Sequence, residues 1–209
     1  TAPAPKDDAE LRKRCADFHD DDIAELEEED PVLFLRYTEA KAAAAATPMS
    51  ESAVRGRDLF FSDRVGCTAC HVGANFADEK FHNLGVGMDV ENPPAGHAAV
   101  SGDEKDTGAF KTPTMRNVAL SAPYMHDGRF STLREVIDHY NSAVAADPFL
   151  DMRLLDRRLA ITGGPVQPVR LELSELEING LLAFLEGLTD VAFLTDPRFS
   201  DPFALADSK

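Results

Sequence analysis

The chain has 209 residues, of which 44% are hydrophobic and none is tryptophan, and this suits one globular domain, alone or with an extension. No apolar run approaches the ~20 residues that a membrane-spanning helix needs, so no membrane span is expected. The formal net charge of −16 argues against a nucleic-acid partner, which attracts lysine and arginine, and favours a basic protein partner.

The first 49 residues are expected to form an acidic and mostly helical N-terminal extension. Its start, "TAPAPKDD", is typical of a mature N-terminus or of an interdomain linker. Charged residues from Ala9 to Glu28 predict an exposed helix or a surface arm, and a second helix is predicted from Pro31 to Ala46. Three cysteines give no even disulfide framework, and Cys15, four residues before His19, is interpreted as a lone thiol.

The next helix is predicted to begin after Ser50, a good N-cap. Gly56 inside this helix indicates close contact with another backbone, because glycine costs a helix interior up to ~1 kcal/mol relative to alanine. The segment from Val72 to Gly108 is rich in glycine, asparagine, proline and aspartate. Such a long irregular stretch in a compact domain usually has a function or wraps a bound group.

Two capping boxes mark the following helices. "TLRE" at 132–135 predicts a helix from about Leu133 to Ser142, and "SELE" at 174–177 predicts another. The second helix has an amphipathic stripe at i, i+3, i+4, i+7 and i+10, formed by Ile178, Leu181, Leu182, Leu185 and Leu188. The tail at 191–209 contains prolines and is expected to wrap over the surface. No strand is evident, so the predicted fold class is all-α with long loops.

Between these helices, "VGCTACHVG" places Cys67, Cys70 and His71 in the order C-x-x-C-H, the attachment signature of c-type haem. Two thiols on one short turn can reach both vinyl groups of a porphyrin while the histidine points at the iron. A thioredoxin-like pair is disfavoured because no βαβ pattern surrounds it, and zinc because no second ligand pair is present. We therefore expect one covalent haem c with its iron, and a periplasmic or otherwise exported protein, since this attachment takes place outside the cytoplasm.

Three blocks of the sequence resemble the C-terminal half of bacterial di-haem cytochrome c peroxidases and MauG-like enzymes. They read "RGRDLFFSDRVGCTACHVGANFADEKFHNLGV", "GAFKTPTMRNVALSAPYMHDGRFSTLREVIDHYN" and "ELEINGLLAFLEGLTD", in the family's order. The resemblance implies a cytochrome c-like haem domain at 50–190, after the extension at 1–49 and before the tail at 191–209. In that family the C-terminal haem relays electrons or, in MauG-like members, stores oxidising equivalents.

The chain also departs from the family pattern. It has one C-x-x-C-H motif where the family has two, it lacks the tryptophan that commonly lies between the haems, and residues 1–49 are too few for the other haem domain. It is therefore either a stand-alone derivative of the second domain or a piece whose partner domain is missing. No catalytic residue is assigned on this ground.

His71 is the expected proximal ligand of the iron. Seven side chains can by their chemistry supply the sixth ligand, namely Met88, Met115, Met125, Tyr140, His82, His126 and His139. By the resemblance, a residue on the helix after the "HDG" block fills this role, a tyrosine in MauG-like members and a methionine in classical peroxidases. That position is Tyr140 here, and Met125 is the alternative. Methionine raises the haem potential, whereas a phenolate stabilises Fe(III) and lowers it.

Other residues are expected to support the cofactor. Arg116, in "TPTMRN", is the expected partner of a haem propionate, because a guanidinium meets a carboxylate in two contacts, and Lys111 is expected to be exposed. "HDG" at 126–128 resembles the family's interface block and also suits a turn. The carbonyl groups near Ser121 and Pro123 resemble the family's calcium position. Calcium is the less favoured expectation, because the other domain's ligand is absent from this chain.

Three functions are open at this point, and electron transfer is favoured. In the first, the acidic surface meets a basic redox protein such as a cytochrome c or a cupredoxin. In the second, the chain is the haem-bearing half of a peroxide-dependent di-haem oxidoreductase, a peroxidase or a MauG-like enzyme. In the third, it is a structural haem subunit of a larger redox complex, which it joins through its acidic arm at Asp20 to Asp30.

Overall fold

In this computed structural model the residues described are 49–156, 167–196, Glu28, Pro31, Phe34 and Arg198. By its internal contacts the chain divides into two units, Thr1–Met49 and Ser50–Lys209. In the first unit the three described residues before position 49 are helical. The rest of both helix predictions in that unit, together with Cys15 and His19, lies outside the described residues.

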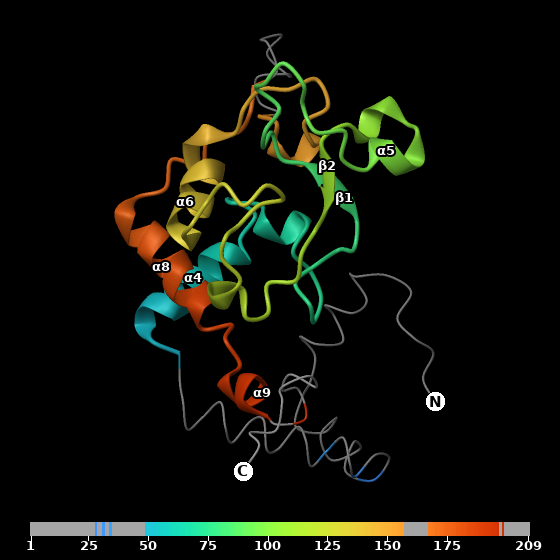
Figure 1. The fold of residues 1–209 in the computed structure, drawn as a ribbon. Helices are drawn as coiled ribbons and strands as arrows, with labels where there is room; N and C mark the ends of the chain where they lie inside the picture. Colours follow the sequence, from blue (N-terminus) through green and yellow to red (C-terminus); the bar gives the residue numbers. More distant parts are fainter. Residues whose placement is uncertain are drawn as a thin grey trace, which may run out of the picture. The chain divides into compact units, whose positions relative to one another are not determined.

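Two crossed helices form the frame of the second unit (Figure 1). α4 (Glu51–Phe60) begins at the predicted N-cap Ser50, and α8 (Glu175–Glu186) begins with the predicted capping box. They touch at Gly56 and Gly180, where a Cβ atom built on Gly56 lies 1.8 Å from the carbonyl oxygen of Gly180. The predicted contact of Gly56 with another backbone is confirmed, and its partner is a glycine of α8.

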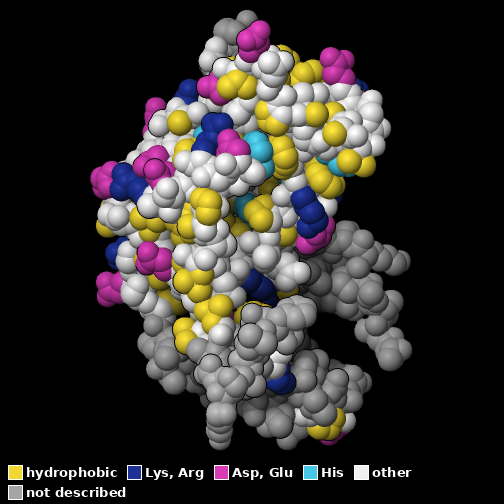
Figure 2. Space-filling view, in the orientation of Figure 1, with side chains coloured by type: hydrophobic (Ala, Val, Ile, Leu, Met, Phe, Trp, Pro, Cys, Tyr) yellow, Lys and Arg dark blue, Asp and Glu magenta, His cyan; other side chains and the backbone are white. Residues whose placement is uncertain are grey.

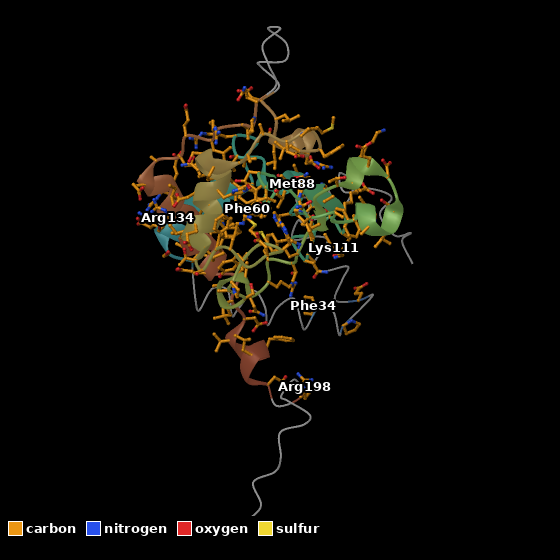
Figure 3. The ribbon with its side chains drawn as sticks, turned by 45° about the horizontal axis from the view of Figure 1, so that its top comes forward. Phe34, Phe60, Met88, Lys111, Arg134 and Arg198 are labelled. Atoms are coloured by element: carbon orange, nitrogen blue, oxygen red, sulfur yellow. The ribbon has the colours of Figure 1, made fainter. Side chains whose placement is uncertain are left out.

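The hydrophobic core lies between these two helices and α6 (Leu133–Asp138). Its buried members are Phe60, Val65, Leu133, Ile137, Leu173, Ile178, Leu181, Phe184 and Leu185. Figure 3 shows Phe60 among the crowded side chains of the interior and Arg134 at the outer edge. Arg134 donates from Nη1 and Nη2 to the carboxylate of Glu175 at 2.9 and 2.7 Å, and so joins α6 to α8 across the surface.

α6 has the predicted start and a different end. Thr132 and Glu135 form the predicted capping box. The prediction of one helix to Ser142 is correct in extent, but α-helical geometry stops at Asp138, and η4 (His139–Ala143) is a π-helical turn. π-helical turns are rare and are frequent at functional sites.

A short antiparallel sheet corrects the expectation that no strand is present. β1 (Phe81–Asn83) pairs with β2 (Ala109–Lys111), with Phe81 opposite Lys111. The two strands bring together distant parts of the glycine-rich stretch. Short turns complete the described part, namely η1 (Cys67–Ala69), α5 (Ala98–Ser101), η2 (Glu104–Asp106), η3 (Val118–Leu120) and η5 (Met152–Leu154). The domain is helical with one small sheet.

The predicted C-terminal tail begins with a helix. α9 (Val191–Thr195) starts at Asp190, whose carboxylate accepts a hydrogen bond from the backbone N–H of Phe193 at 2.9 Å. Beyond Asp196 only Arg198 is described. Within the described ranges, none of the helices combines the length and the apolar character needed to cross a lipid bilayer.

Candidate functional site

A cavity of about 610 Å³ lies inside the second unit, with walls from α4, η1, both strands, α6 and α8. The predicted site residues Cys67, Cys70, His71, Met125 and Tyr140 all line it. Most of the other lining side chains are apolar, and on the face shown in Figure 2 histidine side chains lie among hydrophobic ones. The volume falls within the range of about 300–1,000 Å³ that is usual for sites of small molecules and cofactors.

The two cysteines of the motif reach this cavity as free thiols. Gly66, with φ of 67°, precedes η1 in the left-handed conformation that glycine adopts at little cost and turns the chain into the motif. Burial raises the pKa of Cys67 to about 12 and that of Cys70 to about 11, so both thiols stay protonated at neutral pH. Zinc binding and thiol exchange both use the thiolate, so the burial of this pair disfavours both roles.

His71 presents one ring nitrogen as a ligand atom. Its Nδ1 lies 2.8 Å from the carbonyl oxygen of Phe76, which can only accept, so Nδ1 carries the proton. Burial lowers the pKa of His71, and the neutral ring keeps its lone pair on Nε2. Metal-binding histidines usually have their other nitrogen fixed by such a bond. The ring of Phe60 lies 6.5 Å away, centroid to centroid, and packs against it.

Tyr140 lies on η4 and lines the same cavity. Among the described residues its hydroxyl has no hydrogen-bond partner, whereas the hydroxyl of Tyr124, on the same cavity, donates to the carbonyl of Val118 at 3.0 Å. Burial, followed by the nearby thiols of Cys70 and Cys67, raises the pKa of Tyr140 well above its usual value. The site thus holds a phenol close to both thiols. No other group of the described chain forms a hydrogen bond with its hydroxyl.

The structure separates the remaining ligand candidates into two groups. Those on the cavity wall are Met115, Met125, His82 and His126, and those outside the lining are Met88 and His139. The ring of His126 stacks on Phe110 with centroids 3.7 Å apart. The buried His139 donates from Nε2 to the carbonyl of Leu84 at 3.1 Å. His139 therefore supports the fold beside Tyr140 and does not point into the cavity as a ligand.

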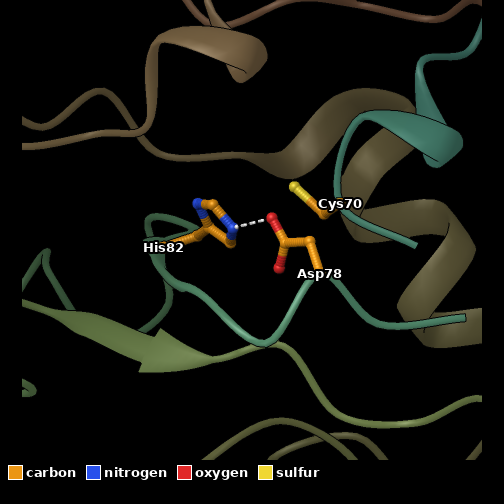
Figure 4. Close-up of side chains that lie close together, drawn as sticks. All are labelled: Cys70, Asp78 and His82. Atoms are coloured by element: carbon orange, nitrogen blue, oxygen red, sulfur yellow. Dashed lines mark hydrogen bonds and ion pairs between the residues drawn. The ribbon is translucent and has the colours of Figure 1, made fainter. Parts of the chain in front are cut away.

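One corner of the cavity is polar. In the described part of the chain, Cys70, Asp78 and His82 form the one group close enough to hold a metal ion (Figure 4). His82 is 5% exposed, and its Nε2 and Nδ1 lie 2.9 Å from Asp78 and 2.6 Å from Asp151. Burial raises the pKa of Asp78, but hydrogen bonds from a backbone N–H, Thr112 and His82 outweigh it and lower the value to about 2. These groups already satisfy one another, and the thiol stays protonated, so we interpret this corner as a hydrogen-bonded support.

Arg116 lies apart from this arrangement. It is exposed, its Nε donates to the carbonyl of Ala74 at 2.9 Å, and it is not among the residues that line the cavity. Its predicted role as a propionate partner gains no support from this position. The cationic side chains on the wall are Lys111, which is exposed as expected, and Arg153, which pairs with Asp151 at 2.9 Å. No sequence motif marks Arg153, and sequence reasoning missed it.

Comparison with known proteins places this chain in a family. MauG of Methylorubrum extorquens is 34% identical over 149 residues, which are 70% of this chain and 37% of that protein. Cytochrome c551 peroxidase of Nitrosomonas europaea is 30% identical over 143 residues, 68% of this chain and 35% of that protein. The chain belongs to the family of MauG-like and di-haem cytochrome c peroxidases. No family model matches it.

A solved structure supports the same assignment. A MauG-like protein associated with microbial copper homeostasis matches with a TM-score of 0.63 and 32% identity, over 77% of this chain and 50% of that one. This MauG-family chain therefore spans between about a third and a half of the length of these relatives. In each of them the match covers one part of a longer protein.

Proposed function

We propose that residues 50–190 form a haem c domain that transfers electrons, and that they correspond to the C-terminal relay domain of the di-haem peroxidases. Family membership supports a haem-based redox function. The cavity also fits the group, because its walls are mostly apolar, two protonated thiols reach it, and no group of the described residues occupies Nε2 of His71. Each thiol can add across a vinyl group, forming a C–S bond while its proton passes to the neighbouring carbon.

The unpartnered hydroxyl of Tyr140 carries the assignment of the sixth ligand. No buried polar side-chain atom of the described chain lacks a partner, so this unpaired hydroxyl is open to the cavity, where a bound group can supply the missing interaction. Tyr140 lies near the thiols that would hold the porphyrin, and it lines the same cavity as His71. We therefore assign His71 and Tyr140 as the residues that would bind the iron, with Met125 as the alternative to Tyr140.

When bound, the haem iron supplies one-electron redox chemistry, and the chain's own residues set how easily it changes charge. Bound to the iron, the phenolate of Tyr140 would be an anionic ligand and would favour the ferric state. It would therefore lower the reduction potential, whereas a methionine ligand would raise it. Once attached, the sulfurs of Cys67 and Cys70 would be neutral thioethers, and together with the neutral His71 they would add no further charge to this site.

Replacing Tyr140 by phenylalanine is expected to abolish the absorption that a phenolate gives to ferric haem and to raise the reduction potential. The measurement is the ferric spectrum and a potentiometric titration of the haem-loaded chain. Tyr124→Phe is the matched control, because it removes a hydroxyl from the same cavity at a cost of about 1 kcal/mol of stability without touching the ligand. If the ferric spectrum is unchanged in Tyr140→Phe and changes in Met125→Leu, the sixth ligand is Met125 instead.

The proposed function of the haem domain is electron transfer with a basic protein partner. The net charge of −16 supports a basic cytochrome c or a cupredoxin as the partner. We expect rapid reduction of the haem by a basic cytochrome c, with a second-order rate that falls steeply as the ionic strength rises. Stopped-flow mixing measures it, and an acidic cytochrome of similar potential is the control. Equal rates and salt dependence with both proteins contradict the proposed partner.

A second function follows from the share of its relatives that the chain covers. The part of the relatives outside the match leaves room for another haem domain, so the chain can be the haem-bearing half of a peroxide-dependent oxidoreductase. Haem content against polypeptide mass, on protein purified from its source, distinguishes the two. One haem on a chain of 22.7 kDa supports the stand-alone cytochrome, and two haems, on a longer chain or with a co-purifying partner, support the enzyme. In both proposals the protein is exported from the cytoplasm, because haem c is attached outside it.

A further inference from the structure

The backbone on both sides of Tyr140 is tied to distant parts of the chain. On one side, His139 is 4% exposed and its Nε2 donates to the carbonyl of Leu84 at 3.1 Å. On the other side, the side-chain Oδ1 of Asn141 accepts the backbone N–H of Leu173 at 2.8 Å. The backbone carbonyl of Asn141 accepts the N–H of Leu171 at 3.0 Å.

These bonds join three walls of the cavity at one point. Leu84 follows β1, while Leu171 and Leu173 belong to the segment before α8, and all three line the cavity. The turn that they hold is η4, whose π-helical geometry is rare because it is less favourable than an α-helix. Bonds from outside the helix therefore stabilise this turn, and Tyr140 lies between the two residues that make them.

We propose that Asn141 and His139 are positioning residues that hold the Tyr140 hydroxyl at the iron. The inference rests on the proposed ligation by Tyr140. A ligand atom has to be held within about 0.5 Å of its productive place, and side chains that support a ligand typically change metal affinity by about 10–100-fold when they are removed. The contacts of Asn141 and His139 fix the backbone of Tyr140, while its own hydroxyl stays available to the metal.

Cyanide affinity of the ferric protein tests the proposal, because cyanide competes with Tyr140 for the sixth position. Asn141→Ala is expected to tighten cyanide binding by about 10–100-fold and to weaken the phenolate absorption. Asn141→Asp keeps an acceptor oxygen for the N–H of Leu173 and is expected to restore the wild-type values. A merely structural role for Asn141 would lower the melting temperature without changing cyanide affinity.

Asn117 supplies the matched control. Its Oδ1 also accepts a distant backbone N–H, that of Asp190, at 2.7 Å, and it does not line the cavity. Asn117→Ala is therefore expected to lower stability and to leave the cyanide affinity at the wild-type value. If Asn141→Ala yields no folded protein, His139→Leu replaces it, with His139→Gln as the variant that keeps a donor for the carbonyl of Leu84.

Tyr140→Phe separates this inference from the proposed function. If Tyr140→Phe tightens cyanide binding and Asn141→Ala and His139→Leu both behave as the wild type, the positioning role is wrong and the ligation by Tyr140 stands. If Tyr140→Phe itself leaves the spectrum and the cyanide affinity unchanged, the ligation by Tyr140 is wrong, and the positioning role falls with it. Tighter binding in both Tyr140→Phe and Asn141→Ala, with rescue by Asn141→Asp, supports the inference.

Discussion

Replacing Gly56 by alanine is expected to prevent stable folding of the haem domain. The new Cβ would lie 1.8 Å from the carbonyl oxygen and 2.2 Å from the carbonyl carbon of Gly180, and these backbone atoms cannot rotate away as a side chain can. α4 and α8 would have to separate and open the core around Phe60 and Phe184. Overpacking usually costs about 1–3 kcal/mol, and a backbone clash at a helix crossing exceeds this range.

The test is the yield and the thermal unfolding of the haem-loaded full chain, followed by circular dichroism. Helix propensity works in the opposite direction, because alanine is favoured over glycine by about 1 kcal/mol inside a helix, so any loss reports the contact. Gly180→Ala is the graded control, since its Cβ would meet the backbone N of Gly56 at 3.2 Å. Gly102→Ala, with nothing within 4 Å, is expected to cost about 1 kcal/mol through its backbone angle alone. If Gly56→Ala unfolds at the same temperature as the wild type, the close contact of α4 and α8 at Gly56 and Gly180 is wrong.

The helix starts could be predicted from the sequence because their signals are local. A capping box joins residues three positions apart, so the boxes at Thr132 and Ser174 predict where their helices begin without any tertiary information. Gly56 predicted a close backbone contact through its cost inside a helix. Its partner, Gly180, depends on how α4 and α8 cross, which no local signal specifies.

The small sheet and the π-helical turn could not be predicted in this way. β1 and β2 have three residues each, fewer than the four to eight in which alternation is recognisable. The end of α6 depends on bonds from Asn141 to a segment about thirty residues further along the chain. A sequence window that includes the capping box contains neither of these partners.

The residues of the candidate site also divide into those that a local motif predicts and those that depend on distant segments. Cys67, Cys70 and His71 were predicted because their chemistry requires one short turn, and the structure places all three on the cavity. Tyr140 came from the family resemblance; the structure places it on the cavity wall, and its binding to iron stays a prediction. The charged groups of the wall come from separate segments, so Arg153 was missed, and Arg116, which motif reasoning favoured, lies elsewhere.

Replacing Cys67 and Cys70 together by serine is expected to abolish haem that remains with the chain after denaturation. Both thiols lie on the cavity wall, and in each the buried sulfur is protonated, the form that carries the hydrogen needed for addition to a vinyl group. Serine keeps the size of the side chain and offers a hydroxyl, which does not make this bond. Haem absorbance that migrates with the polypeptide in denaturing electrophoresis measures the result.

The single variants show how the two sulfurs share the attachment. Cys67→Ser and Cys70→Ser each keep one thiol on the wall, so each is expected to retain haem through a single bond, with the pyridine spectrum of a porphyrin that keeps one vinyl group. Cys15→Ser removes the remaining cysteine of the chain and is expected to retain haem as the wild type does. Retention of haem by the double variant, or its absence from the wild type, contradicts covalent attachment at this motif. His71 is intact in every variant and can still hold haem in the folded protein. A double variant that binds haem when folded and loses it only on denaturation therefore lacks the covalent bonds and keeps the iron–histidine bond.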